Sequence, residues 1–189
     1  MTSDIRIETD RLILRAPQLN DFDAIAAFLA DDRSKTIDVG NMDRNDAWKV
    51  FSRIAGMWFL RGYGLFIVEE KATGKPVASI GPWFPITWPE RELGWSVWTA
   101  EAEGKGIAYE AASAARDYAF EVLGWDTAVS YIDTSNTRSR ALAERLGAII
   151  DPEAEKLGFG APDDDDADPC LVYRHTPQSD NDGTVEAYA

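Results

Sequence analysis

The chain has 189 residues, 45% of them hydrophobic, which suits a single domain that buries a sizeable core. Its net charge of −14 disfavours nucleic acid as a partner, and one cysteine and one histidine exclude an internal disulfide and disfavour a protein-built metal site. No apolar run reaches the ~18–20 residues of a membrane span and no signal segment opens the chain, so we expect a cytoplasmic protein without a membrane partner.

The first part of the chain predicts a strand and then two helices. The expected elements are a strand over residues 5–14 bent near Thr9 and Asp10, a helix from Asp21 or Asp23 to Ala30, a polar loop over 31–42, and a helix from Asp43 or Asn45 to Leu60. The second helix carries aromatic side chains at helical spacing, which is more typical of a core face than of a cofactor site.

The middle of the chain predicts three strands. A hairpin pairs residues 65–70 with residues 76–81 across a connection that contains glycine, and a third strand covers residues 91–98. Between them lies a proline-rich connection that carries Trp83 and Phe84.

A glycine turn at Glu103–Ala108 joins the third strand to an alanine-rich helix that runs to Gly124. Glycine adopts backbone angles closed to other residues, and the first N–H groups of a helix have no partner within it. Such a turn can hold a phosphate or pyrophosphate. It can equally serve as a tight corner alone.

The last part predicts a strand over 127–132, a helix over 137–146 that Asn136 begins and Gly147 ends, and short strands over 148–150 and 170–174. Residues 158–169 form an expected acidic loop, and residues 176–189 an expected disordered polar tail. Calcium binding by the loop aspartates stays open, although the run lacks the terminal glutamate of a complete calcium loop.

The glycine turn, the stretch from Asn136 to Gly147 and the opening residues Glu8–Arg15 together resemble the GCN5-related N-acetyltransferase (GNAT) superfamily. The likeness is greatest to its branch of ribosomal-protein N-terminal acetyltransferases. It implies one α/β domain over residues 1–175, with a mixed, mostly antiparallel sheet of six to seven strands and about four flanking helices. The sheet would be splayed between the strands at 91–98 and 127–132.

The resemblance further implies that acetyl-CoA binds in the splayed gap, with its pyrophosphate on the glycine turn. The residues it assigns to the cofactor are Val97, Trp98, Thr99, Gly104, Lys105, Gly106, Ile107, Ala108 and Asn136. A backbone N–H at Val97–Thr99 would polarise the thioester carbonyl. Glu103 and Ala148 depart from the family pattern, and Glu103 puts a negative charge beside the pyrophosphate unless it points away or pairs with a cation.

Acetyl transfer to an amine needs a base and support for the leaving thiolate. We take Glu92 as the candidate base, or else as a solvated strand residue, and Ser139 as the thiolate's partner, or else as a plain first-turn serine. Tyr131 is a weaker candidate acid. Direct attack by the amine is favoured because Cys170 and His175 lack the spacing of a covalent mechanism.

The resemblance places the acceptor among Trp48, Trp83, Phe84 and the acidic run Asp163–Asp168. Aromatic walls and acid would suit a cationic amine, although the same aromatic residues can simply be core. The acceptor is a protein α-amine or a small-molecule amine, and a homodimer stays open. The alternative is a module that binds acyl-CoA with little or no catalysis, as a sensor or partner domain.

Overall fold

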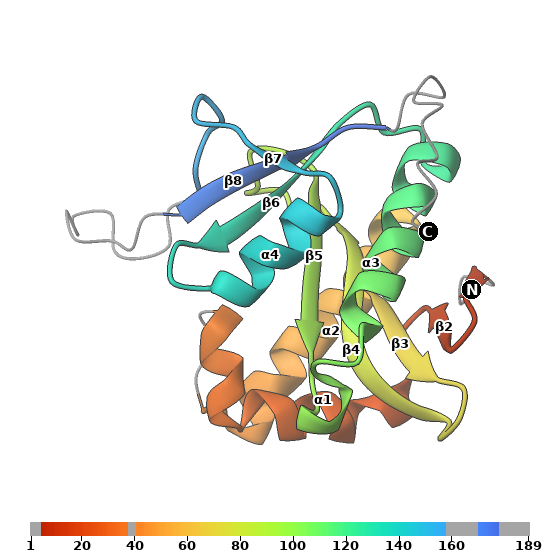
Figure 1. Ribbon diagram of the computed structural model, residues 1–189. Coiled ribbons are helices and arrows are strands. Elements are labelled where there is room, and N and C mark those ends of the chain that lie inside the picture. The colour runs from red at the N-terminus through yellow and green to blue at the C-terminus, as the bar shows by residue number, and fades with distance from the viewer. Residues whose placement is uncertain (1–4, 38–40, 158–169, 178–189) are drawn as a thin grey trace.

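Eight strands form one mixed sheet in the computed structural model, which describes residues 5–37, 41–157 and 170–177 (Figure 1). The strand order is β1-β2-β3-β4-β5-β6-β8-β7. The strands are β1 (Arg6–Glu8), β2 (Leu12–Arg15), β3 (Phe66–Glu70), β4 (Lys75–Trp83), β5 (Glu92–Val97), β6 (Ala128–Asp133), β7 (Ile149–Ile150) and β8 (Cys170–His175).

Four α-helices and four shorter helical segments accompany the sheet in the described part of the chain. The α-helices are α1 (Phe22–Leu29), α2 (Arg44–Arg61), α3 (Ile107–Asp117) and α4 (Thr137–Arg145). The 3-10 helices are η1 (Leu19–Asp21), η2 (Asp32–Ile37) and η3 (Ala100–Ala102), and a π-helical turn η4 (Tyr118–Val122) continues α3. Among these helices none is long and apolar enough to cross a membrane.

The sheet is splayed between β5 and β6, as the sequence predicts. Every other neighbouring pair of strands is antiparallel, whereas β5 and β6 are parallel and pair only at Glu92 and Val129. Beyond that pair the two strands diverge (Figure 1). The backbone groups along the inner edges of β5 and β6 therefore face a gap.

The two faces of the sheet carry two separate cores. Phe66 and Val68 pack with α3, whose Ala111 and Ala115 are fully buried and let the helix approach the strands closely. Ile67, one residue away on the same strand, belongs to the core under α1 and α2. This period of two assigns successive side chains of the strands to opposite faces.

Most expected boundaries agree with the structure within two residues, although β4 includes Trp83, and the larger differences lie at three places. The strand expected over residues 5–14 is a hairpin, because Thr9 N–H donates to the Leu12 carbonyl at 3.0 Å and turns the chain back. This accounts for a sheet of eight strands rather than six to seven. The expected loop at 31–42 contains η2, and the helix expected to reach Gly124 ends in the π-turn, where Leu123 N–H donates to the Tyr118 carbonyl. The expected acidic loop and all but the start of the tail lie outside the described residues.

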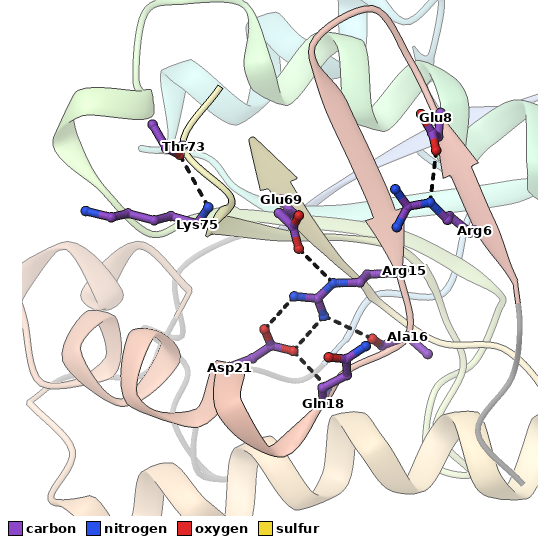
Figure 2. A network of polar contacts seen from close by, with 9 residues as sticks. All are labelled: Arg6, Glu8, Arg15, Ala16, Gln18, Asp21, Glu69, Thr73 and Lys75. Carbon is purple, nitrogen blue, oxygen red and sulfur yellow. Dashed lines mark hydrogen bonds and ion pairs between the residues drawn. The ribbon is translucent and has the colours of Figure 1, made fainter. Parts of the chain in front are cut away.

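A buried ionic network joins the end of β2 to the start of α1 (Figure 2). The Arg15 guanidinium donates to both carboxylate oxygens of Asp21 at 2.8 Å and to Glu69 of β3 at 3.0 Å. Asp21 is 1% exposed and also accepts from the Gln18 backbone N–H at 2.7 Å. Each charge in this network is thus paired, and the Asp21 carboxylate holds the pKa of Arg15 above its usual range.

We expect Asp21→Asn to lower the free energy of unfolding by about 3 kcal/mol, because it leaves a buried guanidinium without its main partner. Urea denaturation measures this change. Asp23→Asn is the matched control, since Asp23 and its partner Arg44 are 80% and 67% exposed. The control should change stability by less than about 0.5 kcal/mol. Equal effects of the two variants would contradict a structural role for the buried network.

Candidate active site

The glycine turn ends with the backbone that a helix-start anion site requires. Gly104 and Gly106 have φ angles of 70° and 76°, and Gly106 is the residue before the first turn of α3. A Cβ at Gly104 would meet nothing within 4 Å, so the conformation rather than the space calls for glycine there. The first N–H groups of α3 lie immediately beyond.

Arg11, from the turn between β1 and β2, braces the glycine turn. Its guanidinium donates to the Lys105 carbonyl at 2.8 Å and to the Glu110 carboxylate at 2.6 Å. Glu110 also accepts from the Thr9 hydroxyl and the Arg11 backbone N–H. The N-terminal hairpin therefore fixes the first turn of α3 and the loop that precedes it.

Glu103 pairs with a cation. Arg138 of α4 donates to its carboxylate at 2.6 Å, so the ion pair links the glycine turn to the start of α4. Of the partners considered from the sequence, the structure selects a nearby arginine rather than Lys105. The unfavourable charge at the start of the turn is thereby neutralised.

A cavity of about 740 Å³ lies between the end of β5, the glycine turn and α4. Of the residues assigned to the cofactor, those that line it are Val97, Gly104, Gly106, Ile107, Ala108 and Asn136. Lys105, Trp98 and Thr99 do not line it. Lys105 is exposed and contributes its carbonyl to Arg11 instead.

The structure places Trp98 outside the lining of this cavity. Its side chain is 2% exposed in the core under α1 and α2, and its backbone N–H donates to the Val77 carbonyl of the neighbouring chain segment at 2.8 Å. The amides of an antiparallel strand alternate between its two edges. The N–H of Val97 therefore points to the other edge, toward the gap.

A second cavity, of about 230 Å³, lies against the first. It is lined by Trp83, Trp88, Glu92, Tyr131 and Asp133 among others. Four residues line both cavities, and these are Trp95, Ser96, Asn136 and Ser139. A ligand in each cavity would therefore meet its neighbour at these four side chains. We call the larger cavity the cofactor cavity and the smaller one the acceptor cavity.

Glu92 lies in the acceptor cavity, on β5. Its carboxylate accepts from the Trp88 indole N–H at 2.6 Å, and the Tyr131 backbone N–H also donates to it. Burial raises the pKa of Glu92 to about 7, more than those two donors and the nearby charge of Arg53 lower it. A carboxyl group with this pKa exchanges protons readily at neutral pH.

Ser139 is held in place from two sides. Asn136 accepts its backbone N–H at 3.1 Å as the N-cap of α4, which is the capping role expected from the sequence. The Trp95 indole N–H donates to its hydroxyl oxygen at 3.1 Å. The hydroxyl proton of Ser139 is then left to point at a group in the cavities.

The other titratable groups considered from the sequence are buried in ways that disfavour proton transfer. Burial raises the pKa of the Tyr131 phenol to about 12 and of the Cys170 thiol to about 11. Burial and the charge of Arg116 lower the pKa of His175 to about 4, and its Nε2 lies 2.9 Å from the Ser130 hydroxyl. His175 thus packs as a neutral ring against Trp95.

The aromatic acceptor wall is only partly present. Trp83 lines the acceptor cavity, but the Arg53 guanidinium lies over its ring at 5.2 Å. Phe84 lines neither cavity and has Arg61 over its ring, and Trp48 packs edge-on against the core residue Phe22. Arginines of the chain thus lie over two of the three rings expected to hold a cationic amine, those of Trp83 and Phe84. The expected contribution of Asp163–Asp168 lies outside the described residues.

Several residues of the site escape sequence reasoning. Trp88 and Trp95 bind the two candidate catalytic side chains, and Arg11 and Arg138 hold the glycine turn. For Arg138 the sequence offers a signal, because the charge of Glu103 calls for a nearby cation. No local pattern identifies the other three, since each contact depends on the packing of separate elements.

Comparison with known proteins agrees with the resemblance to GNAT acetyltransferases seen in the sequence. The acetyltransferase (GNAT) domain family matches residues 11–149. An acetyltransferase from Agrobacterium tumefaciens is 36% identical, with a TM-score of 0.79 over 93% of this chain and 96% of that one. The ribosomal-protein-S5-alanine acetyltransferase from Vibrio fischeri shares the fold at 18% identity and a TM-score of 0.68, over 92% and 97% of the two chains. RimL, a ribosomal L7/L12 α-N-protein acetyltransferase in complex with coenzyme A, shares the fold at 16% identity and a TM-score of 0.68, over 91% of this chain and 98% of that one.

The chain belongs to the GNAT acetyltransferase family and is an acyltransferase enzyme. Acetyl-CoA is the acyl donor that fits this family, and the residues present fit that group. The turn with positive φ angles at Gly104 and Gly106 leaves α3 amides for a pyrophosphate, and the gap beside Val97 offers backbone groups to an extended pantetheine arm.

We expect Glu103→Gln to tighten coenzyme A binding about fivefold, because it removes a negative charge beside the pyrophosphate and releases Arg138. Calorimetric titration with coenzyme A measures the change, which should shrink in high salt. Glu101→Gln is the control: it makes the same change in net charge at an exposed position that lines neither cavity, and it should leave coenzyme A binding unchanged. Weaker binding by the Glu103 variant would instead assign the ion pair a positive role in holding the cofactor.

Proposed function

We propose that the protein transfers the acetyl group of acetyl-CoA to a primary amine, either the α-amine of a protein or an amine of a small molecule. One observation carries the proposal: the cofactor and acceptor cavities meet at Trp95, Ser96, Asn136 and Ser139, with the Glu92 carboxyl on the acceptor side. This arrangement suits an amine and a thioester that react directly with one another.

Glu92 accepts the proton that the acceptor's ammonium group must lose before attack, and its pKa of about 7 suits that role. The amine then forms the C–N bond at the thioester carbonyl, whose oxygen the Val97 N–H polarises, and the C–S bond breaks. The hydroxyl of Ser139 donates to the departing sulfur while Trp95 holds its oxygen. The acceptor nitrogen loses two protons in all: the first passes through Glu92 to solvent, and the second, lost once the C–N bond has formed, ends on the thiol.

A covalent acetyl-enzyme is not part of the proposal. Cys170 is 3% exposed and burial raises the pKa of its thiol to about 11, so little thiolate forms at neutral pH. Neither cavity is lined by Cys170.

The alternative is an acyl-CoA-binding module without efficient catalysis, and a negative charge at Glu103 beside the pyrophosphate would favour it. The ion pair with Arg138 accounts for that residue. Thiol release from acetyl-CoA with a panel of amines separates the two functions. Stabilisation of the protein by coenzyme A without thiol release for any amine would favour the binding module.

We expect Glu92→Gln to lower kcat/KM about a hundredfold on the best acceptor of that panel, the size of effect typical of general-base removal. In the wild-type enzyme kcat/KM should rise with pH through about 7, because the deprotonated carboxylate is the active form. The rise of kcat/KM near pH 7 should be absent in the variant. Deprotonation of the acceptor amine itself affects the pH profiles of both enzymes equally. If kcat/KM and its pH dependence were the same in Glu92→Gln as in the wild-type enzyme, Glu92 would not be the general base.

We expect Trp88→Phe to shift the same rise of kcat/KM to higher pH. The indole N–H at 2.6 Å stabilises the charged carboxylate, so its loss raises the pKa of Glu92 further. The pH profile is the measurement, and coenzyme A affinity is the control because Trp88 does not line the cofactor cavity. A shift to lower pH would contradict the assignment of this titration to Glu92.

A further inference from the structure

A cation lies beside the acceptor cavity. The Arg53 side chain of α2 is exposed, and its guanidinium carbon is 5.2 Å from the ring centroids of both Trp83 and Trp88. Both rings line the acceptor cavity. Contact with two indole faces limits the directions in which this guanidinium can point, while leaving its N–H edge open to a ligand.

In the described part of the chain the charge of Arg53 is not neutralised by a carboxylate, whereas most arginines there make an ion pair. Acidic residues number 33 against 19 lysines and arginines, and arginines such as Arg15, Arg138 and Arg174 each bind a carboxylate. Within residues 5–37, 41–157 and 170–177, Arg53 makes no ion pair. Carboxylates abound in the chain, yet among the described residues none is placed on this cation.

Arg53 is also close to the group that takes the acceptor's proton. The Trp88 ring beside its guanidinium donates its N–H to Glu92, so the guanidinium and the carboxyl contact the same indole. The charge of Arg53 lowers the pKa of Glu92. An acceptor whose amine reaches Glu92 therefore has its neighbouring substituents within the field of Arg53.

We propose that Arg53 is a specificity-determining residue that selects acceptors carrying an anionic group, a carboxylate or a phosphate, close to the reacting amine. This rests on the proposed function. The planar guanidinium can donate two parallel hydrogen bonds to such a group, which lysine cannot. The same charge repels a polyamine, which is the opposite of the cationic acceptor expected from the aromatic walls and the acidic run.

Two sources supply this chemistry: a free amino acid, with its own carboxylate, and a peptide α-amine followed by an acidic side chain. The test therefore compares kcat/KM within two matched pairs, alanine against alaninamide and Ala-Asp amide against Ala-Asn amide. We expect the wild-type enzyme to favour the carboxylate of at least one pair by about tenfold. The pair that shows the preference identifies the source.

Three variants decide whether Arg53 causes that preference. Arg53→Gln should abolish it, Arg53→Glu should reverse it, and Arg53→Lys should retain part of it because the charge remains. The quantity compared is each variant's carboxylate-to-amide ratio divided by the wild-type ratio, in which the different basicities of the acceptor amines cancel.

Arg61→Glu is the matched control. Arg61 lies on the same helix and over the Phe84 ring at 4.7 Å, and Phe84 lines neither cavity. The control makes the same change in net charge and should leave the ratio within about twofold. An equal effect of the Arg61 and Arg53 variants would overturn the proposal, as would Arg53→Gln and Arg53→Glu ratios equal to wild type.

The proposed acetyl transfer and the proposed role of Arg53 are contradicted by different results. Absence of thiol release with every amine overturns the proposed function itself. Turnover of a neutral amine with unchanged ratios in the Arg53 variants overturns only the role of Arg53. A wild-type enzyme that prefers alaninamide, Ala-Asn amide or a polyamine to the acidic acceptors likewise contradicts it.

Discussion

The site depends on where the two halves of the sheet stop pairing. One residue pair, Glu92 with Val129, joins β5 to β6, and the Ser130 hydroxyl reinforces the junction by donating to the Leu93 carbonyl at 2.7 Å. Beyond it both strands expose unpaired backbone edges, which is costly in a sheet interior unless a ligand completes the pattern. The acceptor cavity lies between the two strands, with Glu92 at the closed end of the gap, and the cofactor cavity continues from the end of β5 to the glycine turn and α4.

Burial around this junction sets the chemistry. The acceptor cavity places Glu92 among indole rings and aliphatic side chains, where desolvation opposes its charge. The free energy that this carboxylate costs the folded state is largest above pH 7, where it is ionised, and falls below it. The Arg15–Asp21 network shows the opposite arrangement, in which each buried charge has its partner and no group is left to react.

Local patterns predicted the parts of the fold that depend on neighbouring residues. Asp43 and Asn136 begin their helices, and Gly106 precedes α3 with a positive φ angle, because capping and glycine conformations are set within a few residues. The splay between β5 and β6 also followed from the resemblance to a family, which left the order of the strands in the sheet open.

Sequence reasoning is limited where strand register or the packing of separate elements decides which groups face the site. The sequence places Trp98 on the strand that borders the expected cofactor site. In the structure the Trp98 N–H is hydrogen-bonded to the Val77 carbonyl, so the N–H that points to the unpaired edge is that of Val97. A shift of one residue exchanges these roles, and register is fixed by a partner strand elsewhere in the chain. The contacts of Trp88 with Glu92 and of Arg53 with two indoles have the same non-local origin.

The brace formed by Arg11 bears on when the active site forms during synthesis and folding. Its bonds to Lys105 and Glu110 join residues 94 to 99 positions apart, so they close one of the long loops of the chain. Such contacts form late, because the entropy of loop closure is lost before they contribute. In a nascent chain, Arg11 can bind the glycine turn only after about a hundred further residues have been synthesised. The turn therefore reaches its final form later than the N-terminal hairpin.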